Sequence, residues 1–131
     1  MRARRRRCGA SVCVLRAQRS GHFITTASTA AYRVVPNMAV YAGTKVAVRA
    51  ICEGLRQEAG DCLRVTTVSP GMVRTPFVEA SSNPEVRAAI KRTSDSIGLP
   101  ARAIAEAIAF AIDRPGTVDV SELVVRPTAQ S

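Results

Sequence analysis

A tyrosine and a lysine four residues apart, Tyr41 and Lys45, are the side chains whose types and spacing first indicate a chemistry. Apolar residues recur at helical spacing from residue 39 to residue 59, so both side chains lie on one helix face, about 5 to 6 Å apart at Cβ. A free tyrosine titrates near pH ~10, and a neighbouring ammonium group stabilises its phenolate. The pair is therefore suited to exchanging a proton with a carbonyl or alcohol oxygen.

Ser28 adds a hydroxyl to this pair. It lies at the end of a predicted strand, residues 22–28, thirteen residues before Tyr41. The carboxyl edge of an open α/β sheet is the side on which such sheets bind ligands. From that edge the Ser28 hydroxyl can hold the same substrate oxygen. A Tyr-x-x-x-Lys pair is also typical of an ordinary solvated helix surface, so its interpretation depends on the rest of the chain.

The elements that must position these groups follow from apolar periodicity and from Gly and Pro punctuation. We expect strands at residues 22–28, 63–69 and 122–126 and helices at residues 39–59, 84–93 and 101–112. Asn83 is the expected N-cap of the second helix, and Pro100 opens the third. His22, at the very start of the first strand, is expected in a surface turn. The order β, α, β, α, α, β predicts an α/β protein.

Three segments of the sequence resemble one known family in content, order and spacing. They are SGHFITTASTAAYRVVPNMAVYAGTK, LRVTTVSPGMVRTPF and ELVVRPTAQ. Together they resemble the second half of the short-chain dehydrogenase/reductase family, from about residue 15 to the C-terminus. The resemblance implies a partial Rossmann-type, doubly wound parallel sheet that lacks its N-terminal nucleotide-binding half. It also implies hydride transfer between NAD or NADP and a small carbonyl or alcohol substrate.

The same resemblance implies roles for individual residues. Tyr41 corresponds to the general acid/base, Lys45 to the residue that lowers its pKa and bonds the nicotinamide ribose, and Ser28 to the substrate-orienting hydroxyl. Residues 77–97 resemble the variable flap that covers the substrate. The loop that contacts the nicotinamide carboxamide is matched by Pro70, Gly71, Val73 and Thr75.

The family's phosphate-binding parts have no counterpart in the sequence. A dinucleotide site of this type needs a Gly-rich turn between a strand and a helix, and no Gly-x-Gly occurs in the chain. The family's Asn-Asn-Ala-Gly segment and its catalytic asparagine are absent as well. We therefore expect the chain alone to bind NAD(H) or NADP(H) weakly and to be inactive. The alternative is a non-catalytic remnant or pseudoenzyme that associates with itself, through helix 39–59, or with an intact homologue.

Positive charge is concentrated at the N-terminus. Residues 1–20 contain seven arginines and no acidic residue, whereas residues 21–131 carry 12 basic and 10 acidic side chains. We interpret residues 1–14 as a disordered Arg-rich leader and residues 15–131 as the domain. Three alternatives remain for this leader, namely an Arg-rich arm that binds nucleic acid, a transit peptide, or a stretch translated from an incorrectly placed start. An aromatic content of 4% does not favour specific nucleic-acid binding.

Cysteine, histidine and hydropathy patterns restrict the remaining classes. Four cysteines without a Cys-x-x-Cys motif and a single histidine indicate neither a metal site nor a disulfide framework. No apolar segment approaches the ~18 residues that a membrane span needs. Free thiols are typical of a reducing compartment, so we expect a cytoplasmic protein.

Overall fold

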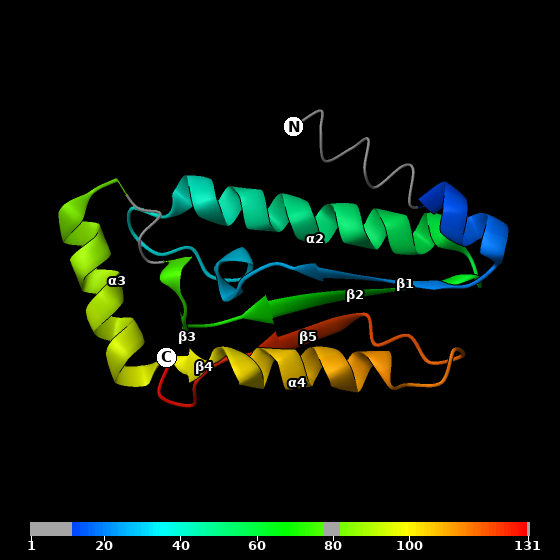
Figure 1. Cartoon of the computed structure of the whole chain (residues 1–131). Helices are drawn as coiled ribbons and strands as arrows, with labels where there is room; N and C mark the ends of the chain where they lie inside the picture. The colour runs from blue at the N-terminus through cyan, green and yellow to red at the C-terminus, as the bar shows by residue number, and fades with distance from the viewer. Residues whose placement is uncertain (1–11, 78–81, 131) are drawn as a thin grey trace.

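The computed structural model describes residues 12–77 and 82–130. Its main sheet has three parallel strands in the order β1-β2-β5. These strands are β1 Gly21–Thr26, β2 Leu63–Pro70 and β5 Glu122–Val125. Figure 1 shows α2 (Ala39–Ala59) along one side of the sheet and α4 (Ala101–Ile112) along the other. The predicted α/β fold with adjacent parallel strands is confirmed.

The core lies on both faces of the central strand β2. Val65 and Val68 are 2% and 0% exposed, because helices cover β2 from both sides, as is usual for a parallel strand. On α2 the small residues Ala42 and Cys52 are buried, and on α4 Ala111 is fully buried. Small side chains at these positions let both helices approach the sheet closely.

Helix α2 begins and ends at the predicted residues. It ends at Gly60, whose φ of 67° lies in the left-handed region that favours glycine. Residues 12–18 form a further short helix, from which the Arg16 guanidinium donates a hydrogen bond to the Glu58 carbonyl. This helix starts inside the range 1–14 that the sequence assigned to the leader, and residues 1–11 lie outside the described residues. Within the described chain, no helix has both the length and the apolar character needed to cross a membrane.

Helix α3 (Pro84–Ile97) runs four residues beyond the predicted end at residue 93. Asn83 caps it as predicted, with its side-chain oxygen accepting from the backbone N–H groups of Glu85 and Val86 at 2.9 and 3.3 Å. A second, two-stranded sheet joins β3 (Val73–Arg74) to β4 (Leu99–Pro100), and the sequence did not predict it. Two-residue strands carry no apolar periodicity, so only the folded chain reveals them.

Two predictions about the first strand were wrong. The strand ends at Thr26 and not at residue 28, because Ser28 caps a 3₁₀ helix, η1 (Thr29–Ala31), that turns the chain away from the sheet. His22 lies within β1 and not in a surface turn, since its Nε2 is 2.7 Å from Thr66 Oγ1 on β2. Among the described residues, β1 pairs with β2 alone and forms an edge of the sheet.

Candidate functional site

The carboxyl ends of β1 and β2 open into a cavity of about 1120 Å³. Every residue that the sequence assigned to catalysis or cofactor binding lines it: Ser28, Tyr41, Lys45, Pro70, Gly71, Val73 and Thr75. These residues come from segments up to 47 positions apart, since Ser28 and Thr75 mark the two ends of the set. The parallel arrangement brings them to one edge because parallel strands end on the same side.

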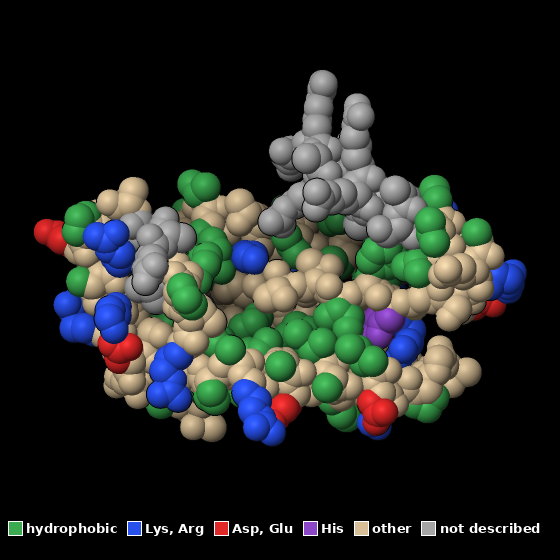
Figure 2. Space-filling model, in the orientation of Figure 1, with side chains coloured by type: hydrophobic (Ala, Val, Ile, Leu, Met, Phe, Trp, Pro, Cys, Tyr) green, Lys and Arg blue, Asp and Glu red, His purple; other side chains and the backbone are tan. Residues whose placement is uncertain are grey.

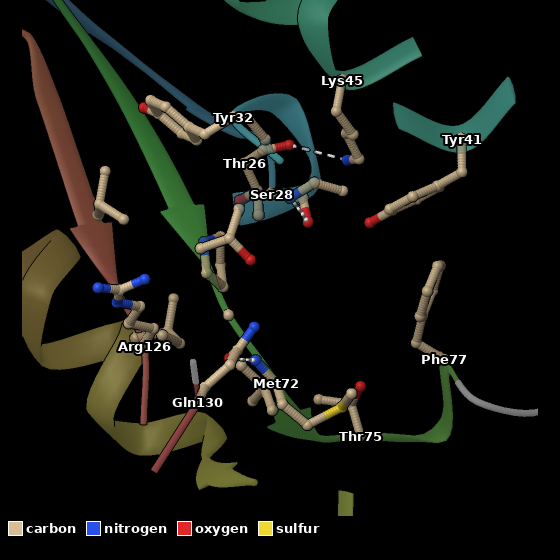
Figure 3. Close-up of a pocket in the computed structure, with 18 of the residues that line it drawn as sticks. Thr26, Ser28, Tyr32, Tyr41, Lys45, Met72, Thr75, Phe77, Arg126 and Gln130 are labelled. Atoms are coloured by element: carbon tan, nitrogen blue, oxygen red, sulfur yellow. Dashed lines mark hydrogen bonds between the residues drawn. The ribbon is translucent and has the colours of Figure 1, made fainter. Parts of the chain in front are cut away.

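Helix α2 presents Tyr41 and Lys45 to this cavity on successive turns of one face. The Lys45 ammonium donates a 3.1 Å hydrogen bond to the Thr26 carbonyl at the end of β1 and lies 5.7 Å from the centre of the Tyr41 ring. In Figure 3 the Tyr41 hydroxyl, the Lys45 nitrogen and the Ser28 hydroxyl point toward one another. This geometry places a fixed positive charge beside a phenol that faces open space.

Ser28 is held by the turn that follows β1. Its backbone is extended, with φ −170° and ψ 156°, and its Oγ accepts a 3.1 Å hydrogen bond from the Ala30 N–H. Because this bond uses a lone pair of the oxygen, the hydroxyl proton remains available for a bound ligand. The cap therefore leaves a hydroxyl donor at the same cavity that Tyr41 lines.

The loop after β2 forms another wall of the cavity. The Gly71 N–H donates to the Val125 carbonyl at 2.8 Å, and the Met72 N–H donates to the Gln130 side-chain oxygen at 2.8 Å. A Cβ on Gly71 would lie 2.3 Å from that oxygen and 2.7 Å from Arg126 Cβ, so only glycine fits without a shift. The loop backbone thus lines the cavity and is fixed by hydrogen bonds to β5 and to the C-terminal segment.

Part of the predicted flap reaches the site. The Phe77 ring packs against the Tyr41 ring with centroids 5.7 Å apart and planes tilted by 44°. Phe77 is 58% exposed, so this contact covers the tyrosine from one side only. Residues 78–81 of the flap lie outside the described residues, and its residues 84–97 form α3.

Apolar and basic side chains complete the cavity. Ile104 and Ile108 of α4 line it, and Figure 2 shows hydrophobic side chains gathered between the strands and α4. The charged lining residues of the described chain are Arg33, Lys45 and Arg126, all of them basic. A cavity with this character favours a ligand that combines an apolar or aromatic part with oxygen atoms or negative charge.

Sequence reasoning missed several lining residues. Gln130 and Arg126 follow the last strand, and Tyr32 follows η1; all three line the cavity. One spacing in the sequence could have drawn attention to this part of the site. Arg49 lies four residues after Lys45 on the same face of α2, and in the structure its guanidinium lies 4.0 Å over the Tyr32 ring. Among the described residues, no group of three or more His, Cys, Asp or Glu side chains is arranged to hold a metal ion.

Comparison with known proteins identifies the family. A family model described as enoyl-(acyl carrier protein) reductase matches residues 7–120, and it is one of the models of the short-chain dehydrogenases/reductases. The chain belongs to the short-chain dehydrogenase/reductase family. An uncharacterized oxidoreductase of Staphylococcus saprophyticus is 44% identical over 126 residues, which cover 94% of this chain and 51% of that protein.

Solved structures of family members show the same fold. A closed form of serine dehydrogenase complexed with NADP+ is similar with a TM-score of 0.79 and 28% identity, over 88% of this chain and 47% of that one. An alcohol dehydrogenase of Thermococcus sibiricus complexed with 5-hydroxy-NADP is similar with a TM-score of 0.68 and 27% identity, over 84% and 43%. The chain therefore spans about half the length of the relatives it matches.

Proposed function

We propose that this chain provides the proton-transfer and nicotinamide end of an oxidoreductase that interconverts a carbonyl and an alcohol with NAD or NADP. The observation that carries the proposal is the convergence of the Tyr41 hydroxyl, the Lys45 ammonium and the Ser28 hydroxyl on one cavity. Carbonyl reduction requires a proton donor at the carbonyl oxygen and stabilisation of the negative charge that develops on the same oxygen.

The residues present fit one end of the cofactor better than the other. The Pro70–Gly71 turn lines the cavity without a side chain at position 71, where the packed C-terminal segment leaves no room for one, and Lys45 supplies a donor to the same cavity. These groups fit a carboxamide and a ribose. No Gly-x-Gly turn for the pyrophosphate occurs in the sequence, so we expect weak binding by this chain alone.

Each residue has a defined task in the reduction. When bound, NAD(P)H supplies the hydride that forms the new C–H bond at the carbonyl carbon. Tyr41 gives its phenol proton to the carbonyl oxygen, and Ser28 donates a hydrogen bond to that oxygen so that it faces Tyr41. The ammonium of Lys45 stabilises the phenolate that remains. Alcohol oxidation runs through the same groups in the opposite direction.

A chimera tests this proposal directly. Residues 15–131 would replace the corresponding half of the Staphylococcus saprophyticus relative, which supplies the other half, and oxidation of NADH and NADPH would be followed with a panel of small ketones and aldehydes. We expect turnover, and we expect Tyr41→Phe to lower it by about 10²-fold or more while cofactor affinity stays nearly unchanged. A Tyr41→Phe chimera that keeps more than about a tenth of the activity contradicts the role of Tyr41.

The unmodified chain provides the companion measurement. Titration calorimetry with NADPH and NADH should show binding weaker than micromolar, because the contacts to adenosine and pyrophosphate are lacking. Micromolar affinity would contradict this part of the proposal. We also propose that the protein works in the cytoplasm, since the spacing of its four cysteines is not typical of a disulfide framework.

A non-catalytic role through self-association is the second candidate function. Helix α2 exposes three large apolar side chains: Val40 is 85% exposed, Val46 46% and Ile51 60%. Val40 and Ile51, eleven residues apart, lie on one face of the helix, and this face supports pairing with a second copy or with an intact homologue. Sedimentation analysis should detect a dimer, and Val40→Glu combined with Ile51→Glu should shift it to monomer. A monomeric wild-type chain over the micromolar range would reject self-association.

A further inference from the structure

A three-residue cluster beside the cavity belongs to none of the catalytic groups. Arg49 of α2 forms a two-point contact with Glu122 of β5, with Nε to Oε1 at 2.7 Å and Nη2 to Oε2 at 3.2 Å. The same guanidinium lies 4.0 Å over the centre of the Tyr32 ring. The cluster therefore connects a helix, a strand and the turn that follows η1.

The cluster fixes direction as well as distance. A guanidinium that bonds a carboxylate at two points is held in a plane, and an aromatic ring stacked on that plane is held with it. The paired arginine lowers the pKa of Glu122, and the neighbouring Tyr32 adds to this effect. Both side chains of the ion pair are partly exposed, at 31% and 39%, so the cluster matters for geometry more than for stability.

Tyr32 is connected to Ser28 through one short turn. Ser28 is the N-cap of η1 and Tyr32 is its C-cap, with the Tyr32 N–H donating to the Thr29 carbonyl at 3.0 Å. Ala31 between them is buried. A turn of this length cannot tilt at Tyr32 without also moving its N-cap, Ser28. The position of the Tyr32 ring therefore determines the position of the Ser28 hydroxyl.

Arg49 also shares a helix face with the catalytic pair. It follows Lys45 by four residues and Tyr41 by eight, which is two turns of the helix. One rigid helix thus carries both the proton donor and the group that anchors the opposite turn. Figure 3 shows Tyr32 and Ser28 on one side of the cavity and Tyr41 on the other.

We propose that Arg49 is a positioning residue, which is fixed by Glu122, holds the Tyr32 ring against its guanidinium and thereby sets the Ser28 hydroxyl at the distance from Tyr41 that a shared substrate oxygen requires. This inference rests on the proposed function for the roles of Ser28 and Tyr41. The placement of η1 by Arg49 is a structural claim that can be measured without turnover.

The chain contains a matched control on the same helix. Arg56 bonds Glu53 at 2.7 Å through both Nε and Nη2, and its side chain is 40% exposed. This pair resembles the Arg49 pair in chemistry and exposure, but it is local to α2 and no ring stacks on it among the described residues. Arg56→Gln therefore removes an equivalent ion pair without touching η1.

The structural arm of the test uses the full chain and nuclear magnetic resonance. The sequence has two tyrosines, so Tyr32→Phe assigns both ring signals in a sample with labelled tyrosine. Arg49→Gln and Glu122→Gln should shift the Tyr32 ring signals and should speed exchange of the Ala30 amide, which donates to Ser28, by about tenfold. Arg49→Lys should behave like Arg49→Gln, because an ammonium provides neither the fork nor the stacking plane. Arg56→Gln should leave all of these signals unchanged.

The functional arm repeats the variants in the turnover assay described above. Arg49→Gln should lower kcat by about tenfold and leave KM within about twofold, since it disturbs the alignment of Ser28 and Tyr41 and not substrate contacts. Unchanged Ala30 exchange and Tyr32 signals in folded Arg49→Gln and Glu122→Gln overturn the inference. If the signals move while no preparation turns over, the placement of η1 by Arg49 stands and the proposed function fails. If the signals move and kcat does not, the positioning role is rejected while the proposed function stands.

Discussion

The two ends of the main sheet use their polar side chains in opposite ways. At the amino end, the Arg64 guanidinium donates three hydrogen bonds to carbonyls at the end of α4 and just after it, those of Ala111 at 3.1 Å, Ile112 at 3.3 Å and Arg114 at 2.9 Å. At the carboxyl end, the Tyr41 and Ser28 hydroxyls face an open cavity. Charge at the amino end holds the fold together, whereas polar groups at the carboxyl end remain available to a ligand.

This difference follows from the parallel arrangement of the strands. All strands of the sheet end on one side, and the connections to the helices there form loops that leave a crevice. On the other side, α4 ends with carbonyls that have no partner within the helix and attract a basic side chain. We therefore predict that variants at the carboxyl end change function with little change in stability. Variants at the amino end should change stability with little change in function.

The largest effect is expected for Lys45→Met. The change removes the ammonium beside Tyr41 and its bond to the Thr26 carbonyl, so turnover in the chimera should fall by about 10²-fold and cofactor affinity should weaken. The thermal midpoint should change little. Lys91→Met is the control, since Lys91 pairs with Asp95 on exposed α3. Full activity of Lys45→Met would contradict the proposed role of the lysine.

Gly71 does not fit the contrast between the two ends of the sheet, because it both lines the cavity and packs against the C-terminal segment. Gly71→Ala therefore tests how far that contrast holds. The new methyl group would overlap Arg126 Cβ at 2.7 Å, so the free energy of unfolding should fall by about 1 to 3 kcal/mol. Gly43→Ala is the matched control: an added methyl group there would meet no neighbouring atom within 4 Å, and the variant should gain about 0.5 to 1 kcal/mol. Urea unfolding measures both, and equal effects would show that the close approach at Gly71 is unimportant.

Arg64→Met should reduce stability without altering the cavity. Hydrogen bonds to charged groups contribute about 1.5 to 3 kcal/mol, and since Arg64 is partly exposed we expect a loss near the lower end, about 1.5 kcal/mol. Arg102→Met on α4 removes an exposed pair with Glu106 and should cost below about 0.5 kcal/mol. If the two variants unfold at the same urea concentration, Arg64 does not hold the end of α4.

The smallest effect is a pH dependence at the amino end. Burial lowers the pKa of His22 below its ordinary 6.5, and the positive charge of Arg64 lowers it further. The unfolded chain therefore binds a proton first as the pH falls below about 6.5, so the stability contributed by neutral His22 is present above that pH and is lost below it. Between pH 7.5 and 5.5 the wild-type chain should therefore lose stability that His22→Gln does not lose. If the stabilities of the two proteins change with pH in parallel, His22 is not the source of the pH dependence.

Local signals predicted two of the helices to the residue. The boundaries of α2 and α4 follow from apolar periodicity, from Gly60 and from Pro100, all of which act within a few residues of the chain. The Asn83 cap is equally local. The end of β1 was predicted too late because Ser28 is extended like a strand residue yet caps η1, and this choice depends on what the turn packs against.

The sequence by itself predicted seven residues that all line one cavity, but not Tyr32, Arg126 and Gln130, which line it as well. It also determined the helices that carry or enclose them, because periodicity and capping are encoded within single segments. Only the tertiary structure decided what holds those residues in place. Gln130 supports Met72 from 58 positions away, and Glu122 meets Arg49 from 73 positions away. A contact between distant segments has no spacing rule, so it becomes visible only when parallel strands bring their ends together.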